Sequence, residues 1–239
     1  MGVADAPATG VEDFLLLDAG REPADAECYL ERMAKTAKSA GVKKTRVGGL
    51  EKAKGPGRLR GPAKVLDSHV SFQGKIFSVT TDTVTEPGGV TSTRDVIRHN
   101  GSVIVLAVDS SRSKRNPTVL IERQYRHAAG QFLLELPAGR IEPGEKPLAA
   151  AKRELIEETG YRARKWTPLT RYFASPGFLS EEMLVYLAED LYAGEAQPEE
   201  DEKIELLHIP LSDLLRDIQA GKVKDGKTIL SVLLYASKR

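Results

Sequence analysis

The sequence predicts an α+β fold that begins with an antiparallel strand region. Three observations lead to this prediction. Short segments rich in Val, Thr and Ile follow one another from His69 to Leu136, as is typical of strands. The segment 147–159 has the composition and the boundaries of a helix. Two more helical segments, one amphipathic and one apolar, come near the end of the chain.

The N-terminal part of the chain differs in composition from the rest. Residues 1–34 are mildly acidic, whereas 35–64 contain ten Lys and Arg residues and a single acid, Glu51. Gly and Pro are frequent between 41 and 62, so few residues remain that could pack. We therefore expect a weakly ordered extension with a basic linker over 1–64, a strand region over 65–100 and the main domain over 101–239.

The first predicted elements are strands. The segments before and after Pro87-Gly88-Gly89 form a hairpin pattern, because Pro and Gly favour a turn between two Val- and Thr-rich runs. The segment 103–108 is continuously apolar, which indicates a strand buried on both faces. We expect strands at 70–72, 76–85, 90–99, 103–108, 118–125 and 132–136.

The helix at 147–159 has clear start and stop signals. Pro147 lies in its first turn, strong helix formers follow at 149–151, and Gly160 is placed to end it. Further strands are expected at 183–187 and 204–209. The apolar residues of 211–218 recur at i, i+3, i+4 and i+7, and 228–236 is strongly apolar, so both segments are predicted helices.

The bulk composition excludes several classes of protein. The 35 Lys and Arg residues balance 34 Asp and Glu residues, so no overall field favours nucleic acid or an anionic membrane. The single cysteine, Cys28, cannot form an internal disulfide, which suits a reducing cytoplasm. Residues 1–20 are too acidic for a signal peptide, and no apolar run approaches the roughly 18 residues that cross a bilayer. We expect a cytoplasmic protein.

Three glutamates on the 147–159 helix indicate a metal site. Glu154, Glu157 and Glu158 stand at i, i+3 and i+4, so their carboxylates share one helix face and repel one another unless a cation lies among them. Mg²⁺ is the natural candidate, with Mn²⁺ as the alternative, because hard cations prefer carboxylate oxygens. Gly139 permits a turn that aims a backbone carbonyl at the same metal. A solvated helix face is the alternative for this short motif alone.

The segment from Gly139 to Tyr161 resembles a complete Nudix box. Gly139 is followed after five residues by Glu145, and seven residues later by Arg-Glu-Leu-Ile-Glu-Glu-Thr-Gly from Arg153. Seven fixed positions would match by chance on the order of 10⁻⁸ per window. Only Tyr161 departs, where the family usually has an aliphatic residue. The resemblance implies an α/β/α sandwich around a mixed sheet, and hydrolysis of a nucleoside diphosphate linked to another group.

Family roles follow where positions match. The resemblance implies that Glu154 and Glu158 bind metal directly and that Glu157 is a further or water-mediated ligand. It implies that the carbonyl of Ala138 completes a second metal position and that Arg153 orients a glutamate by an ion pair. Metals held in this way neutralise the diphosphate and help to turn bound water into hydroxide.

The flanking segments resemble those of ADP-ribose pyrophosphatases. The run from Arg123 to Arg126, the segment 134–139 and the entry strand 74–79 carry this resemblance, together with Pro176, sixteen residues after Gly160. It predicts ADP-ribose as substrate, with AMP and ribose 5-phosphate as products. GDP-mannose or another nucleoside diphosphate sugar is the alternative, and a non-catalytic nucleotide-sensing module is the second alternative. The intact acids argue against the module.

Residues outside the box are assigned by chemistry and resemblance. Arg126 is the first choice for a phosphate clamp, because a guanidinium grips two oxygens at once, with an arginine on a sheet edge as the alternative. Arg123 belongs to the same segment. Glu135 is a candidate active-site acid, with a surface strand glutamate as the alternative. The general base is expected in the acidic run 199–202, with Glu202 before Glu200, unless this run is a solvated loop.

Two expectations concern partners. By the resemblance, the chain pairs as a homodimer, with the early strands at about 66–100 crossing to the other copy. The basic stretch 35–64 lacks interleaved aromatic residues, so it is interpreted as a solvated linker, with an RNA-facing tail as the alternative.

Overall fold

The computed structural model describes residues 61–194 and 203–239. The predicted general bases, Glu202 and Glu200, lie outside the described residues, as does nearly all of the predicted extension over 1–64. Within the described residues, no helix is long and apolar enough to cross a membrane.

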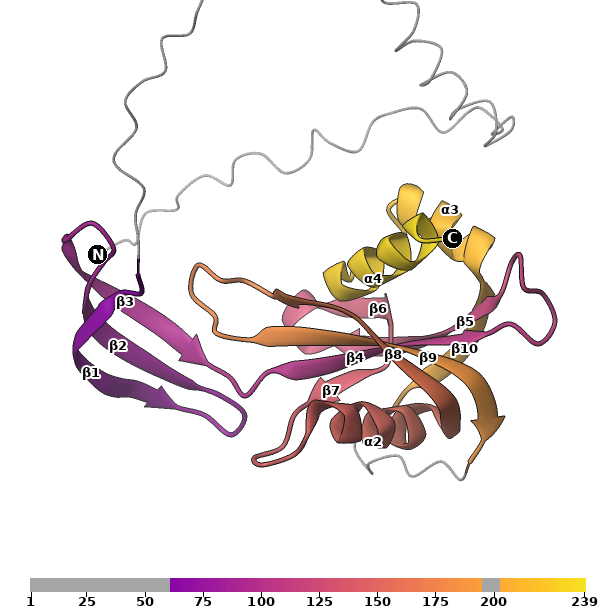
Figure 1. Ribbon diagram of the computed structural model, residues 1–239, viewed down its shortest axis with the longest axis horizontal. Coiled ribbons are helices and arrows are strands. Elements are labelled where there is room, and N and C mark those ends of the chain that lie inside the picture. The colour runs from indigo at the N-terminus through magenta and orange to yellow at the C-terminus, as the bar shows by residue number, and fades with distance from the viewer. Residues whose placement is uncertain (1–60, 195–202) are drawn as a thin grey trace, which may run out of the picture. The chain divides into compact units, whose positions relative to one another are not determined.

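The first sheet has three antiparallel strands in the order β1-β2-β3 (Figure 1). They are β1 (Lys64–Gln73), β2 (Ser78–Thr85) and β3 (Thr91–Arg98). The predicted hairpin is confirmed, because Gly88 and Gly89 adopt φ of 108° and 89° in the turn between β2 and β3. β1 is longer than the predicted strand at 70–72, and all of its residues are exposed.

The second sheet has seven strands and is mixed. Its main path runs β10-β5-β4-β9-β8, while β6 pairs with β5 and β7 pairs with β4. The pairing of β4 with β9 is parallel and the other pairings are antiparallel. The strands are β4 (Ser102–Asp109), β5 (Thr118–Arg126), β6 (Gln131–Glu135), β7 (Ala138–Arg140), β8 (Tyr161–Phe173), β9 (Glu182–Ala193) and β10 (Glu205–Pro210).

Helices cover both faces of this sheet. α2 (Pro147–Thr159) lies on one face, and α3 (Leu211–Gln219) and α4 (Gly226–Ser237) lie on the other (Figure 1). A 3₁₀ turn, η2 (His127–Ala129), connects β5 to β6. The α/β/α sandwich around a mixed sheet that the resemblance implied is therefore confirmed.

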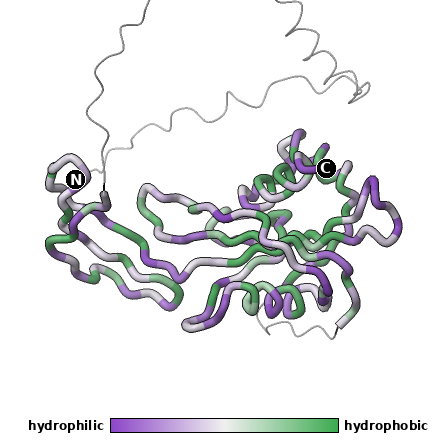
Figure 2. Tube along the Cα trace, in the orientation of Figure 1, coloured by the Kyte–Doolittle hydropathy of each residue, from purple (hydrophilic) through white to green (hydrophobic). Residues whose placement is uncertain are grey.

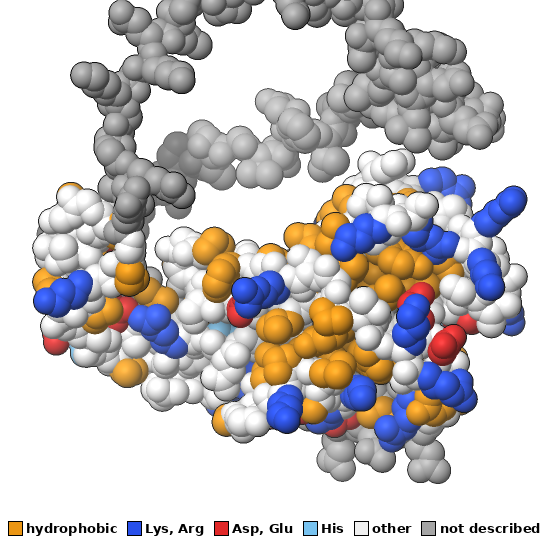
Figure 3. Space-filling view, in the orientation of Figure 1, with side chains coloured by type: hydrophobic (Ala, Val, Ile, Leu, Met, Phe, Trp, Pro, Cys, Tyr) orange, Lys and Arg blue, Asp and Glu red, His pale blue; other side chains and the backbone are white. Residues whose placement is uncertain are grey.

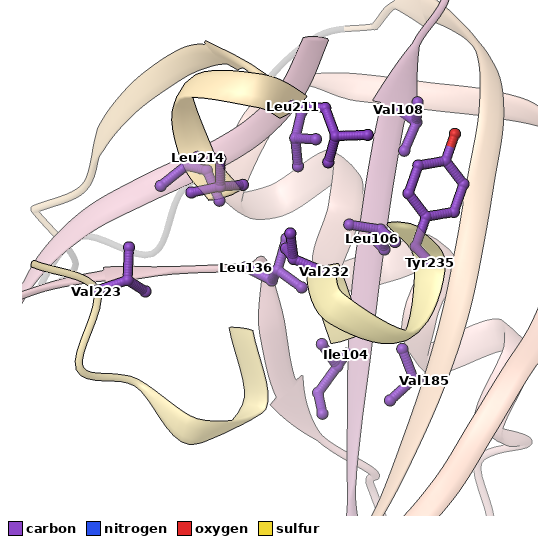
Figure 4. Close-up of a cluster of buried hydrophobic side chains, with 12 residues drawn as sticks. Ile104, Leu106, Val108, Leu136, Val185, Leu211, Leu214, Val223, Val232 and Tyr235 are labelled. Atoms are coloured by element: carbon purple, nitrogen blue, oxygen red, sulfur yellow. The ribbon is translucent and has the colours of Figure 1, made fainter. Parts of the chain in front are cut away.

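β4 forms the centre of the core, as its continuously apolar sequence predicted. Ile104 and Leu106 point into the cluster beneath α3 and α4, whereas Val103 and Val105 point into the cluster beneath α2, and all four are fully buried. Apolar residues concentrate along these inner strands (Figure 2). Val232 and Tyr235 of α4 belong to the cluster beneath α3 and α4 (Figure 4).

The sequence did not predict β8. This strand pairs with β9, which itself extends beyond the predicted 183–187, and it lies at one end of the described sheet. Pro168 lies within β8, next to a register shift between Pro168 and Thr170. Proline is confined to edge strands and bulges because it has no N–H to donate. An internal proline and interspersed Arg and Lys residues therefore concealed the strand.

Candidate active site

The box helix has the boundaries that the sequence predicted. Pro147 stands at its start, and Gly160 follows it with φ of 71° and donates its N–H to the Ile156 carbonyl at 3.0 Å. The helix buries Ala151 and Leu155 against the sheet. This packing fixes the rotation of α2, and with it the direction in which its glutamates point.

The carboxylate of Glu154 occupies the space beside Gly139. A Cβ added to Gly139 would lie 2.0 Å from the carboxyl carbon of Glu154, so any larger residue here would displace this carboxylate. Glu154 is 9% exposed. The box therefore needs its glycine for close approach of a helix carboxylate to the loop, more than for an unusual backbone conformation.

The carboxylate of Glu158 contacts the same loop at Ala138, the residue before Gly139. The N–H of Ala138 donates to Glu158 Oε2 at 3.0 Å. The loop is also tied to the core, since the Val105 N–H donates to the Pro137 carbonyl at 2.8 Å and the Leu136 N–H donates to Thr228 Oγ1 at 2.8 Å. Loop and helix thus form one unit, as the sequence predicted from Gly139.

Arg153 links the acids of the box. It donates through Nη1 to Glu154 at 2.7 Å and to Glu157 at 2.9 Å, and through Nη2 to the Arg140 carbonyl at 3.1 Å. Its Nε and Nη2 also bind both carboxylate oxygens of Glu145, at 3.1 and 3.0 Å. The hydrogen bonds to Glu145 and the nearby glutamates raise the pKa of Arg153. The hydrogen bonds from Arg153 lower the pKa of Glu145.

The donor set fits a divalent metal in chemistry. Glu154, Glu157, Glu158 and the Ala138 carbonyl supply only hard oxygen atoms, which suit Mg²⁺ or Mn²⁺. Across residues 61–194 and 203–239, however, no three His, Cys, Asp or Glu side chains are gathered as a ready-made metal cluster. The hydrogen bonds explain this, because Arg153 holds Glu154 and Glu157 while the Ala138 N–H holds Glu158.

The partly exposed Arg126 and the buried Glu135 form an ion pair, on the α2 face of the sheet by the alternation of β5 and β6. Arg126 donates through Nε and Nη2 to the two oxygens of Glu135, at 2.8 and 2.9 Å. Glu135 is 2% exposed, so it is neither a solvent-facing acid nor a surface strand residue. Lys227, at the start of α4, binds the same carboxylate and also pairs with Asp225 at 3.1 Å.

The structure does not bring Arg123 together with Arg126. Residues three apart on a strand point to opposite faces, and Arg123 follows Ile121, which faces α3 and α4. Arg123 pairs with Glu205 at 3.2 Å, and its guanidinium lies 4.0 Å from the centre of the Phe132 ring. Of the two predicted clamp residues, only Arg126 lies on the face that carries the box helix.

Sequence reasoning missed Lys227 and its partner Asp225. One signal was available, because Lys227 is the only charged residue in the otherwise apolar α4. Asp225 caps this helix by accepting from the N–H of Thr228 at 3.0 Å and from its hydroxyl at 2.6 Å. The pattern of Asp225 three residues before Thr228 therefore indicated a capped helix start, and this is where Lys227 and Asp225 lie.

A polar pocket of about 490 Å³ opens beside the box loop. Arg140 and Glu142 line it on one side, and Arg98 and His99 at the end of β3 line it on another. The end of β3 is fixed, since the Ser180 N–H donates to the Ile97 carbonyl at 2.9 Å. The pocket has the polarity and size to hold part of a charged, nucleotide-sized ligand.

Comparisons with known proteins agree with this geometry. A model of the NUDIX domain matches residues 98–230. The ADP-ribose pyrophosphatase of Bacillus subtilis (strain 168) is 36% identical over 171 residues, covering 71% of this chain and 90% of the relative. The methanol dehydrogenase activator of Bacillus methanolicus has the same identity over the same length and the same coverage.

Two further similarities concern substrate and fold. The GDP-mannose pyrophosphatase of Citrobacter koseri is 35% identical over 154 residues, covering 57% of this chain and 77% of the relative. A solved structure described as an ADP compounds hydrolase superposes with a TM-score of 0.64 at 21% identity, covering 74% of this chain and 94% of that one. This structural likeness establishes the same fold.

Proposed function

This chain belongs to the NUDIX domain family, and we propose that it hydrolyses the pyrophosphate of ADP-ribose, to AMP and ribose 5-phosphate, or of a related nucleoside diphosphate sugar. One observation carries the proposal. The carboxylates of Glu154 and Glu158 meet the Ala138–Gly139 loop, one in the space that a side chain at Gly139 would fill and the other on the Ala138 N–H.

The box residues have distinct roles in this proposal. Glu154 and Glu158, with the Ala138 carbonyl, would hold a divalent metal, and Glu157 would hold it directly or through water. When bound, Mg²⁺, or Mn²⁺ as the alternative, would supply positive charge to the diphosphate and lower the pKa of a water. Arg153 orients the glutamates, because it donates hydrogen bonds to Glu154 and Glu157.

The substrate and the attacking water are handled outside the box. Arg126 presents its guanidinium on the α2 face of the sheet, where it can grip phosphate oxygens. The polar pocket beside Arg140 receives another part of the ligand. Glu202, or Glu200 in its place, takes the proton of the attacking water.

A product screen tests the proposed reaction. The full chain is incubated with Mg²⁺ and separately with ADP-ribose, GDP-mannose, NADH, diadenosine polyphosphates or capped RNA. We expect ADP-ribose to be consumed fastest, with AMP and ribose 5-phosphate released in equal amounts. Faster release of GMP and mannose 1-phosphate would favour the alternative that the Citrobacter relative suggests.

The variant Glu158→Gln tests the metal-binding role. We expect turnover to fall by several orders of magnitude, because an amide is a poor ligand for a hard cation. The fold should persist, since the amide oxygen can still accept from the Ala138 N–H. Glu189→Gln, which removes a surface partner of Lys165, serves as the control. Unchanged turnover in Glu158→Gln would remove this glutamate from the metal site.

A non-catalytic module is the weaker alternative, although one relative is described as an activator. A sensor does not need metal-binding acids, yet the loop and helix place Glu154 and Glu158 together against one turn. Binding of ADP-ribose without product formation at saturating Mg²⁺ would favour the sensor.

We also propose that the chain forms a homodimer through the β1–β3 sheet and acts in the cytoplasm. Exposed apolar side chains support the dimer, some of them visible in Figure 3. They are Val65, Leu66, Val70, Phe72, Ile76 and Val90, each more than half exposed. The cytoplasmic location stays the prediction made from the single cysteine and the N-terminal composition.

A further inference from the structure

Four charged side chains from three separate segments form a cluster that includes Arg126. Arg126 ends β5, Glu135 ends β6, and Asp225 and Lys227 lie at the start of α4. Glu135 accepts from both Arg126 and Lys227, and Lys227 reaches Asp225 at 3.1 Å. Only Arg126 has a side chain with substantial exposure, at 42%, compared with 2% for Glu135 and 11% for Lys227.

We infer that Glu135 is a positioning residue, whose buried carboxylate, shared between Arg126 and Lys227, fixes the Arg126 guanidinium on the face of the sheet that carries the box helix. The inference rests on the proposed function, in which Arg126 grips a phosphate. Glu135 itself touches no substrate.

The bidentate geometry gives Glu135 this effect. A carboxylate that binds both Nε and Nη2 fixes the plane of a guanidinium as well as its position. The Nη1 group is not part of this pair, so it remains at the end of the side chain where a phosphate oxygen can approach. The hydrogen bonds to Glu135 and, to a smaller extent, the charge of Glu158 raise the pKa of Arg126.

Lys227 also binds the carboxylate that holds Arg126. Two cations, Arg126 and Lys227, and two carboxylates, Glu135 and Asp225, make the cluster neutral overall. Lys227 takes a share of the Glu135 charge from the side of α4, where solvent hardly reaches it. Glu135 is therefore bound from two sides, which fixes the carboxylate that holds Arg126.

The same segment also carries the metal-facing loop. Glu135 precedes Leu136, whose N–H binds Thr228 at 2.8 Å, and Ala138 follows two residues later. α4 thus holds the arginine through Lys227 and Glu135, and holds the loop through Thr228.

Steady-state kinetics of Glu135→Gln on ADP-ribose test this role. We expect KM to rise about tenfold or more while kcat changes less than about threefold, since a misplaced clamp weakens binding of ground state and transition state alike. Glu189→Gln, which removes a carboxylate from a surface ion pair, should leave both constants unchanged. A fall in kcat with unchanged KM would overturn the inference.

A double-variant cycle separates positioning from general damage. Arg126→Lys keeps the positive charge but loses the planar guanidinium that binds two oxygens at once. It should therefore raise KM about as much as Glu135→Gln does. If Glu135 acts through Arg126, adding Glu135→Gln to Arg126→Lys should change KM by less than about twofold. If KM in the double variant rises by the product of the two single-variant increases, Glu135 acts elsewhere and the inference is overturned.

A spectroscopic readout does not depend on turnover. In ¹⁵N-labelled full-length protein, the Nε–H signal of Arg126, identified by its loss in Arg126→Lys, should be shifted and slow to exchange with water. Glu135→Gln should move it toward the position of a solvated arginine. If Glu135→Gln does not fold, Glu135→Asp should move it in the same direction. A signal that does not move would overturn the inference. If the signal moves as expected but the protein does not hydrolyse ADP-ribose, only the proposed reaction is overturned.

Discussion

At position 139 the lack of a side chain lets the Glu154 carboxylate lie against the loop. Gly139→Ala would place a methyl group 2.0 Å from the carboxyl carbon, so Glu154 must move. We expect kcat/KM to fall by about 10² or more, because a ligand displaced by an ångström no longer supports the reaction. Assays of ADP-ribose hydrolysis at saturating Mg²⁺ measure this fall.

Gly226→Ala is the matched control for this substitution. A Cβ at Gly226 meets no atom within 4 Å, and the residue begins α4. Activity should stay unchanged, and stability should rise slightly, since alanine is a better helix former than glycine. An active Gly139→Ala variant would mean that Glu154 can leave the loop without loss of function.

Glu135 makes stability dependent on pH. Burial raises its pKa, but the hydrogen bonds and charges of Arg126 and Lys227 outweigh this, so its pKa lies below the ordinary 4.5. A folded-state pKa below the unfolded one stabilises the protein above pH 4.5, and this stabilisation is lost as the pH falls through the lower value. Urea unfolding from pH 7 down to pH 3 should show a smaller loss in Glu135→Gln than in the native protein.

The glutamine variant should also be less stable at neutral pH. Arg126 and Lys227 would lose their shared carboxylate, which costs on the order of 1–3 kcal/mol, since Arg126 is partly exposed and Lys227 keeps Asp225 as a partner. Equal stability of the two proteins at pH 7, or parallel pH curves, would contradict the assigned pairing.

At the residue level, the sequence predicted the box and its neighbours unevenly. Spacing alone placed Glu154 and Glu158 on one helix face, and the structure brings both against the loop. The second partner of Glu135, Lys227, could not be predicted, because this contact joins residues 92 apart in the chain. Local patterns contain no information on such long-range pairs.

At the level of elements, α4 supports the active-site loop through one hydroxyl. Thr228 is fully buried, accepts the Leu136 N–H at 2.8 Å and donates to Asp225 at 2.6 Å. Thr228→Val leaves that N–H buried without its acceptor, so we expect a loss of about 1–3 kcal/mol in the free energy of unfolding. Chemical denaturation of both proteins measures the difference.

Thr228→Ser keeps the hydroxyl and removes the methyl group, so it is the converse of the nearly isosteric Thr228→Val. It should lose less stability than Thr228→Val and should retain activity. If valine is tolerated as well as serine, the hydroxyl bridge between loop and helix is unimportant.

Elements with one strong local signal were predicted best. α2 begins and ends at the predicted residues because proline and glycine mark its ends. β4 was recognised because a strand covered on both faces is apolar throughout. β8 was missed because an end strand tolerates charge and proline, so its sequence lacks a strand pattern.

At the scale of the whole molecule, the exposed apolar side chains of β1 favour pairing of two copies. Val70→Asp places a charge on a strand residue that is 58% exposed, so it should weaken the proposed dimer without disturbing the fold. Sedimentation equilibrium should give a mass near 52 kDa, twice the 26.1 kDa chain, for the native protein and a lower mass for the variant.

Leu148→Asp is the control for this experiment, since Leu148 is also an exposed aliphatic residue, at 38%, but lies on α2. It should leave the mass unchanged, and an acid in the first turn suits the helix dipole. A native protein that sediments as a single chain would remove the dimer from the proposal.

The outer edge of β8 has a consequence for behaviour at high concentration. A long strand at a sheet border offers a row of backbone groups on which strands of other molecules can assemble into aggregates. Pro168 supplies no N–H to such a row, and the neighbouring register shift disrupts its even spacing. The longest strand of the described sheet is thus a poor template for fibre growth. Pro168, which made the strand hard to predict from the sequence, also makes its edge unsuitable for pairing with other molecules.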